Sequence, residues 1–406
     1  MNIELFISRR LAFKSKKSFS RFIIRVAMIA VSLSVAIMIV AGSIVSGFQK
    51  EISEKVFGFW GHIIIRSYEE NTSYGEEPIS SVQSFYPSLE KEDGVRHIQV
   101  FATKAGIIKT ENEIEGIVLR GIGKDFDWSF LQKYLVKGTK ISAGDTASQK
   151  QIIISQTTAD RLKLMVGDEV VVYFVQEPMR YRKLTIAGIY KTGLDEYDRM
   201  YALVDIGLIR RLNGWKMNEV GGFEVYISNV NDLDKMGYLI NQNFVGQKLE
   251  ARTMRDINPN LFDWLNLQNM NEQVIIILMI LVAVINMTTV LLILILERTN
   301  MIGILKSLGA SDWMIRKIFL YHAAYITGLG LLLGNFLGIG LALAQKYLHI
   351  IRLDEQSYYV SVAPVMLDPV YIILINAGTL IVCLITLIIP SYLVSRISPV
   401  KAIRFE

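Results

Sequence analysis

VAMIAVSLSVAIMIVAGSIVSGF, residues Val26–Phe48, contains no Asp, Glu, Lys or Arg and exceeds the roughly 20 residues that an α-helix needs to cross a bilayer. Three other stretches share this character: Val274–Leu296, Ile318–Ala344 and Val370–Leu393. Residues 49–271 are far more polar and long enough to bury a core of their own. The predicted fold is therefore an α-helical membrane protein with four transmembrane helices, and with a large mixed α/β extracytoplasmic domain inserted between the first and second helices.

The segments predicted around these stretches cover the whole chain of 406 residues. They are a basic interfacial helix or topogenic tail at 1–21, transmembrane helix 1 at 22–48, the α/β domain with helical stalks at 49–271, transmembrane helix 2 at 272–296, a cytoplasmic loop at 297–317, transmembrane helix 3 at 318–344, a short outer loop at 345–369, transmembrane helix 4 at 370–394 and a cytoplasmic tail at 395–406. One stalk continues the first helix through QKEISEKVFGFW. The other opens at Asn258-Pro259, because proline suits the first turn of a helix.

Basic residues gather beside the apolar stretches, as the positive-inside rule describes for cytoplasmic segments. The net charge is +5, and the clusters are Arg9, Arg10, Lys14, Lys16, Lys17, Arg21 and Arg25, then Arg298, Lys306, Arg316 and Lys317, then Arg396, Lys401 and Arg404. The loop 345–369 carries three acidic residues against two basic ones. This distribution predicts cytoplasmic termini, a cytoplasmic loop at 297–317 and a large domain on the other side. It argues against a nucleic-acid partner.

Between the stalks, short runs rich in Ile, Val and Tyr alternate with helical patterns, which predicts a mixed α/β domain. The predicted strands are His62–Arg66, His97–Ala102, Ile117–Gly121, Gln151–Ser155, Glu169–Phe174, Lys183–Ile189, Met200–Val204 and Phe223–Ile227. The predicted helices are Thr157–Leu164, Asp205–Leu212 and Val230–Phe244, and Asn71–Glu77 and Ser142–Gln149 are predicted loops.

The cytoplasmic loop reads ERTNMIGILKSLGASDWMIRKIF from Glu297. Glu297–Leu308 suits a short helix, which Gly309 ends with a positive φ, and Ser311 or Asp312 caps the next helix. Two interpretations stay open. The short helix exposes Met301, Ile304 and Leu305 to a groove on a soluble partner, or it is a tight connector packed at the interface.

Small and polar residues mark the predicted spans. Gly330, Gly334 and Gly338 share one helix face, which predicts close packing, within the same chain rather than with a second copy. Asn286, Asn335 and Asn376 are amides within spans, where interhelical hydrogen bonds are the usual role. Since the spans lack ionisable groups other than His322, an ion-coupled transporter is not favoured.

No catalytic, cofactor-binding or metal site is predicted on this chain. It has no GxxxxGK[ST] loop, no HExxH and no GxSxG, and its single cysteine, Cys383, excludes a disulfide within one chain. The acidic cluster Asp195, Glu196 and Asp198 is interpreted as a solvated turn.

Several motifs point to a known family. A large domain after the first of four spans, with ERTxxIGILKSLGAS between the second and third, resembles the permease subunits of ABC transporters of the MacB/FtsX superfamily. FISRRLAFKSKKSFSRFIIRVAMIAVSLSVAIMIVAGSIVSGFQKEI near the start, GIYKTGLDEYD at Gly188–Asp198 and IIPSYLVSRISPVKAIRFE at the end are similar to the lipoprotein-releasing permeases of the LolC/LolE type.

The resemblance implies a multi-pass protein of the cell inner membrane, with cytoplasmic termini and a periplasmic domain. It implies a separate ABC ATPase subunit that holds ATP and Mg, a second permease as homodimer or heterodimer partner, an acylated lipoprotein substrate, contact with membrane lipid and a periplasmic lipoprotein carrier. The chain itself would be a non-catalytic subunit without a cofactor. The alternatives are a MacB-like permease for efflux of peptides or drugs, and an FtsX-like relay that controls a periplasmic hydrolase.

The resemblance also assigns candidate residues by position. The short cytoplasmic helix corresponds to the coupling helix seated on the ATPase, with Glu297, Arg298, Met301, Ile302, Ile304, Leu305, Lys306 and Gly309. The first and second spans would line a cavity for acyl chains, with Val40, Ile44, Phe48, Val274, Ile277 and Leu281. The same apolar residues would equally suit bilayer contact or helix packing.

One departure from the family concerns the carrier. Family members that recruit a carrier do so with a protruding hairpin loop, whereas VYFVQEPMRYRKLTI at Val172–Ile186 has only a short connection. Either the hook is reduced to Glu177, Pro178, Met179 and Arg180, or carrier docking belongs to a partner.

Overall fold

The computed structural model describes residues 19–68, 77–110, 113–145, 147–174, 176 and 178–397. The chain divides into two compact units. The helical unit comprises the chain up to Gln49, Trp264–Arg352 and the chain from Val362, and the α/β unit comprises Lys50–Asp263 and Leu353–Ser361. The predicted interfacial helix at 1–21, the predicted loop Asn71–Glu77 and the tail 395–406 lie mostly outside the described residues.

Four helices are long and apolar enough to cross a membrane, which confirms the predicted number of spans among the residues that the structure describes. They are α2 (Phe19–Trp60), α9 (Pro259–Glu297), α11 (Asp312–Leu348) and α13 (Pro369–Ser391). Between them lie the short helices α10 (Thr299–Ser307) and α12 (Glu355–Tyr358), and the turn η4 (Tyr392–Arg396) follows α13.

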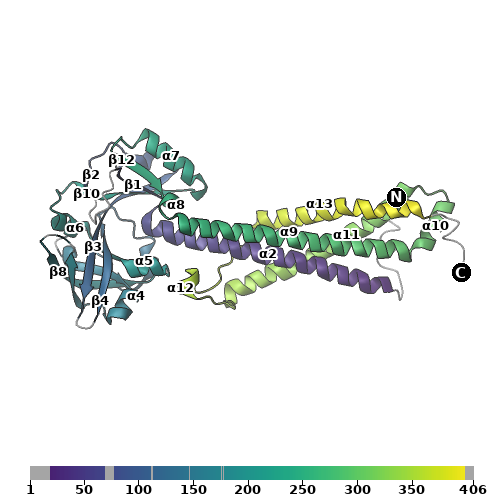
Figure 1. The fold of residues 1–406 in the computed structure, drawn as a ribbon, viewed down its shortest axis with the longest axis horizontal. Helices are drawn as coiled ribbons and strands as arrows, with labels where there is room; N and C mark the ends of the chain where they lie inside the picture. Colours follow the sequence, from purple (N-terminus) through teal and green to yellow (C-terminus); the bar gives the residue numbers. More distant parts are fainter. Residues whose placement is uncertain are drawn as a thin grey trace. The chain divides into compact units, whose positions relative to one another are not determined.

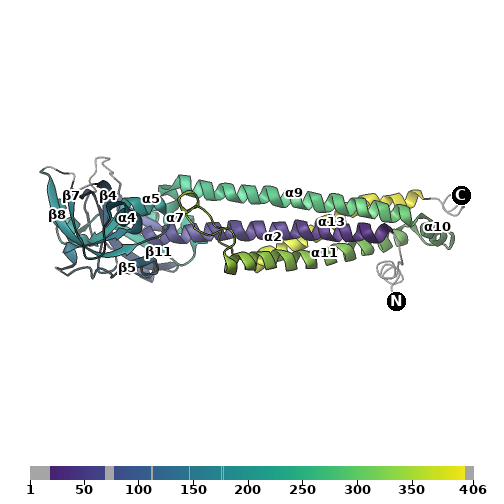
Figure 2. The ribbon, with the colours of Figure 1, turned by 90° about the horizontal axis from the view of Figure 1, so that it is seen from below.

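Two of these helices far exceed the thickness of a bilayer. α2 has 42 residues and α9 has 39, so each is about 60 Å long, twice the hydrocarbon thickness of about 30 Å. Their outer parts form the predicted stalks, and Pro259 is the first residue of α9, as expected. α2 and α9 run alongside each other in both views (Figures 1 and 2).

The glycine face of α11 packs against α2 of the same chain, as predicted. A methyl group added at Gly334 would lie 2.8 Å from the carbonyl oxygen of Ser32 and 2.8 Å from Cβ of Val35. Gly330 and Gly338 meet the same helix at Val31, Ala36 and Ile39. Only glycine allows the two backbones to approach so closely.

Two of the three span amides bond between helices. Nδ2 of Asn335 on α11 donates to Oδ1 of Asn376 on α13 at 2.6 Å, and Nδ2 of Asn376 donates back at 2.9 Å. Each amide also donates to a carbonyl of its own helix. This confirms the interhelical role predicted for this pair, whereas Asn286 is half-buried on α9. Cys383 is buried.

The α/β unit is built on one ten-stranded mixed sheet in the order β12-β1-β11-β3-β4-β9-β6-β8-β5, with β7 paired to both β3 and β8. Because β7 joins β3 to β8, the strands β3, β4, β9, β6, β8 and β7 close into a ring. The strands are β1 (Ile63–Ser67), β3 (Val95–Lys109), β4 (Ile114–Ile122), β5 (Leu135–Gly138), β6 (Gln151–Ser155), β7 (Glu169–Phe174), β8 (Arg180–Tyr190), β9 (Tyr201–Asp205), β11 (Gly222–Ile227) and β12 (Leu249–Thr253).

A two-stranded sheet and short helices complete the α/β unit. β2 (Ile79–Ser80) pairs with β10 (Glu219–Val220). The helices are α3 (Leu131–Tyr134), α4 (Gln156–Leu162), α5 (Asp195–Met200), α6 (Ile206–Asn213), α7 (Leu233–Asn243) and α8 (Met254–Ile257), with the turns η1 (Ser88–Lys91), η2 (Ser148–Lys150) and η3 (Val230–Asp232).

The prediction of a solvated acidic turn at Asp195–Asp198 was wrong for the turn and for Asp198, although Glu196 is exposed. These residues form α5, and Asp198 is buried, where it accepts hydrogen bonds from the N–H groups of Thr192 and Gly193 and from the hydroxyl of Thr192. A carboxylate can be buried when several donors replace water in this way. Burial still raises the pKa of Asp198, and these hydrogen bonds oppose that shift.

Candidate functional site

The short helix predicted for the cytoplasmic loop is α10, which spans Thr299–Ser307 rather than Glu297–Leu308. Glu297 is instead the last residue of α9, and Arg298 precedes the first turn of α10. Gly309 has φ +89°, so it ends the helix in the left-handed conformation that the sequence suggested. The side chain of Ser311 accepts a hydrogen bond from the N–H of Met314 and caps α11.

One side of α10 is open and the other is buried. Ile304 is 53% exposed and Leu308, just past the helix, is 78% exposed. Met301 and Leu305 are half-buried against the helical core, and Ile302 is completely buried within it. The apolar part of the open face therefore consists of Ile304 and Leu308, and Leu308 was not among the exposed residues predicted from the sequence.

Lys306 connects α10 to two other segments of the chain. Its ammonium group donates to the carbonyl oxygens of Ser395 at 3.3 Å and Ile397 at 2.8 Å, and lies 2.9 Å from Oδ1 of Asp312. Arg316 supports the same place by donating to Oγ of Ser395 at 3.0 Å. These contacts join α10 to the start of α11 and to the segment that follows α13.

The predicted acyl-cavity residues lie on two apolar faces of the helical unit. On α2, Phe22, Val26, Ile29, Leu33 and Ile37 are exposed, and the half-buried Val40, Ile44 and Phe48 continue that face at the same helical spacing. On α9, Val274, Ile277 and Leu281 are all exposed, Ile277 at 63%. We call these two rows the apolar stripes.

Two hydrogen bonds join α2 and α9 just beyond the apolar stripes. Nε2 of Gln49 on α2 donates to Oδ1 of Asn269 on α9 at 2.6 Å and to the carbonyl of Leu265 at 3.3 Å. This pair could not be predicted from the sequence, because nothing in either segment alone shows that the two amides meet.

Within the α/β unit, α2 ends on a buried ion pair. Nη2 of Arg120 on β4 donates to both carboxylate oxygens of Glu224 on β11, at 2.8 and 2.6 Å, and both side chains are buried. The rings of Phe59 and Trp60, the last turn of α2, lie 5.0 and 4.8 Å from the guanidinium, and Phe126 lies 5.3 Å away. Arg120 thus holds the end of the stalk against the sheet.

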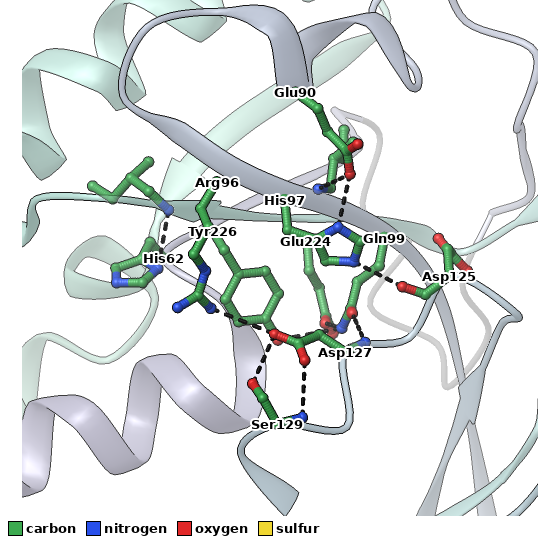
Figure 3. Close-up of polar contacts among 12 residues, drawn as sticks. His62, Glu90, Arg96, His97, Gln99, Asp125, Asp127, Ser129, Glu224 and Tyr226 are labelled. Atoms are coloured by element: carbon green, nitrogen blue, oxygen red, sulfur yellow. Dashed lines mark hydrogen bonds and ion pairs between the residues drawn. The ribbon is translucent and has the colours of Figure 1, made fainter.

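A wider polar cluster adjoins Glu224 of this pair (Figure 3). Gln99 donates to Glu224 at 2.6 Å, and His97 lies between Oε1 of Glu90 and the carbonyl of Asp125, at 2.7 Å from each. Asp127 accepts hydrogen bonds from the N–H and hydroxyl of Ser129. These bonds fasten the 123–129 loop to β3. Among the described residues, no group of three or more His, Cys, Asp or Glu side chains could hold a metal ion.

The residues proposed from the resemblance as a reduced carrier hook lie between β7 and β8. Phe174 pairs with Arg180, so the connection is short, and Glu177 lies outside the described residues. Pro178 and Met179 are exposed, whereas Nη1 of Arg180 donates to the carbonyl of Leu212.

Both units of the chain match models of known protein families. Residues 26–236 match the family model described as MacB-like periplasmic core domain, and residues 273–399 match the model described as FtsX-like permease C-terminal.

Full-length relatives are similar to this chain from end to end. The lipoprotein-releasing system transmembrane protein LolC of Neisseria meningitidis is 24% identical and covers 98% of each chain. LolC of Haemophilus influenzae is 24% identical over 97% of this chain and 96% of its own, and LolE of the same organism is 21% identical over 99% of both. Since the MacB-like model alone spans more than half of the sequence, this chain belongs to the MacB/FtsX superfamily of ABC-transporter permeases and is related to its LolC and LolE members.

Proposed function

We propose that this chain is a permease subunit of an inner-membrane ABC transporter that extracts lipoproteins from the outer leaflet and passes them to a periplasmic carrier. The apolar stripes on α2 and α9 carry the proposal. In this proposal, the role in lipoprotein release for which the relatives are named extends to this chain. The charge distribution supports cytoplasmic termini and a periplasmic α/β unit.

The chemistry of the stripes suits acyl chains. The α2 stripe consists of aliphatic and aromatic side chains and the α9 stripe of aliphatic ones, and neither carries a charge over the part that spans the bilayer. Transfer of an acyl chain between apolar surroundings and water involves about 0.8 kcal/mol per CH₂, so removal of a lipoprotein from the bilayer needs an external energy source.

That source is ATP bound with Mg by a separate ATPase subunit, which docks on the open face of α10 at Ile304 and Leu308. A second permease, identical or related, completes the transporter. The match to the MacB-like domain supports an alternative function as well, namely efflux or mechanical relay on the same architecture.

Photocrosslinking from Ile277 in cells, with mass spectrometry of the captured molecule, tests the proposal. The expected product is an acylated lipoprotein that disappears when ATP turnover is allowed. The matched control is Ile373 on α13, an equally exposed apolar residue outside both stripes, which should capture lipid only. Capture of a soluble peptide at position 277, or of lipid alone at both positions, would overturn lipoprotein extraction.

A further inference from the structure

The loop between α11 and α13 is a compact closed structure. Nε2 of Gln345 donates to the carbonyls of Ile351 and Ala363, and its Oε1 accepts from the N–H of Ile351. The N–H of Leu353 then bonds to the carbonyl of Ser361 at 3.0 Å. These hydrogen bonds close the base of the loop. The segment Leu353–Ser361 belongs to the α/β unit, although α11 and α13, which flank it, are in the helical unit.

Two lysines hold this segment in the α/β unit. Nζ of Lys191, just after β8, lies 2.6 Å from Oε2 of Glu355, the first residue of α12. Nζ of Lys55 on the stalk part of α2 donates to the carbonyl of Tyr359 at 3.0 Å, and Lys55 is buried there. α12 is thus fastened both to the stalk and to the sheet.

The turn that receives α12 is shaped for it. Gly193 has φ +79°, and a methyl group added there would lie 2.6 Å from Oε1 of Glu355 and 3.0 Å from Nζ of Lys55. The buried carboxylate of Asp198 fixes this turn through the three hydrogen bonds described above. The motif GIYKTGLDEYD therefore acquires a physical reason, since its Lys, Thr, Gly and final Asp build the seat.

The helices α11 and α13 are also held by bonds at their ends opposite α12. Lys306 joins α10 to the carbonyls that follow α13 and to Asp312 at the start of α11. The amide pair Asn335–Asn376 links α11 and α13 midway. A displacement of α10 thus has a continuous route of bonded contacts along α11 and α13 to α12.

We propose that Leu353–Ser361 is a coupling latch, and that its seat at Lys191, Gly193 and Lys55 transmits motion of α11 and α13 to the α/β unit. This route is additional to the stalks α2 and α9. The test of the latch by substrate release rests on the proposed function. The tests by ATP hydrolysis and by closure of the latch do not.

Charge reversal and charge exchange test the latch in the full transporter, with its ATPase, in lipid nanodiscs. Glu355→Lys places a third positive charge beside Lys191 and Lys55 and should lower substrate released per ATP hydrolysed about fivefold, as expected for the loss of an ion pair. ATP hydrolysis should continue. The double variant Lys191→Glu with Glu355→Lys restores the pair and should restore coupling, which a folding defect would not allow.

A matched control is available in the same unit. Lys183 and Glu169 form an exposed ion pair between β7 and β8, away from the seat, and Lys183→Glu should leave coupling unchanged. Unchanged coupling in Glu355→Lys, or failure of the exchanged pair to restore it, would overturn the latch.

Closure of the latch can be measured without any substrate. Cysteines placed at positions 191 and 355, in a Cys383→Ala background, should be bridged by a short bifunctional thiol reagent both with and without trapped nucleotide. The bridged transporter should hydrolyse ATP as before. Bridging in only one nucleotide state would contradict a permanently engaged latch. Normal closure with no lipoprotein release by the unmodified transporter would refute the proposed function and leave the latch standing.

Discussion

Among the described residues, Arg120 has the largest fully buried side chain. Taking a guanidinium out of water costs several kcal/mol, and here a bidentate carboxylate and three aromatic faces offset that cost. The arrangement is sensitive to the loss of one partner, because the other charge would remain buried and uncompensated.

We expect Glu224→Gln to lower the free energy of unfolding of the α/β unit by about 3 kcal/mol, the cost of breaking a buried ion pair. Urea unfolding followed by tryptophan fluorescence measures this, since Trp60 lies against Arg120. Glu169→Gln in the exposed pair with Lys183 should cost under about 0.5 kcal/mol. Equal effects of the two substitutions would contradict the role given to Arg120.

A second residue-scale prediction concerns His62, whose ring stacks on Phe57 and accepts a hydrogen bond from the N–H of Ile227. Burial, with a smaller contribution from Arg96, lowers its pKa to about 4. The unfolded chain therefore binds a proton that the folded chain does not between about pH 6.5 and pH 4, so stability falls as the pH is lowered through this window.

Relative to His62→Gln, which keeps an acceptor but does not titrate, the unmodified protein should lose about 2–3 kcal/mol of unfolding free energy between pH 7 and pH 4.5. Urea unfolding of both proteins at these two pH values gives the difference, and other titrating groups cancel. Parallel losses in the two proteins would show that His62 is protonated without penalty.

At the scale of elements, the contact between α11 and α2 depends on the absence of side chains. Gly334→Leu should destabilise the helical unit by about 1–3 kcal/mol, because the added atoms would overlap α2. Gly340→Leu on the same helix meets nothing within 4 Å and is the control. Thermal unfolding in detergent measures both, and similar midpoints would mean that the two helices separate easily.

Elements with a strong local signal could be predicted from the sequence. Uncharged apolar runs locate the four spans, and β6 and β7 have the predicted bounds because both are short runs of β-branched or aromatic residues, which favour strands. β3 extends to Lys109, well beyond the predicted strand, and β5 and β12 were missed, because pairing with distant strands rather than local propensity holds them. The contacts of Lys306, which the resemblance assigned to the coupling helix, could not be predicted because its partners at Ser395 and Ile397 are about 90 residues away.

At the scale of the whole molecule, the order of spans and domain follows from hydropathy and charge, and the relatives extend along the entire chain. The latch does not follow from these signals. A nine-residue segment between two apolar stretches reads as a connector, and only the fold shows that Glu355 and Tyr359 meet residues far earlier in the chain. The motif around Gly193 was noticed as a family resemblance, but its physical role required the structure.

The unbroken course of α2 from Phe19 to Trp60 constrains how this architecture can change in evolution. Each residue inserted into a helix turns everything beyond it by about 100° and advances it by about 1.5 Å. A single insertion in the stalk would rotate Phe59 and Trp60 away from Arg120, whereas seven residues, close to two full turns, would restore their phase. Stalk length in such proteins should therefore vary in steps of about seven residues, and in α2 and α9 together.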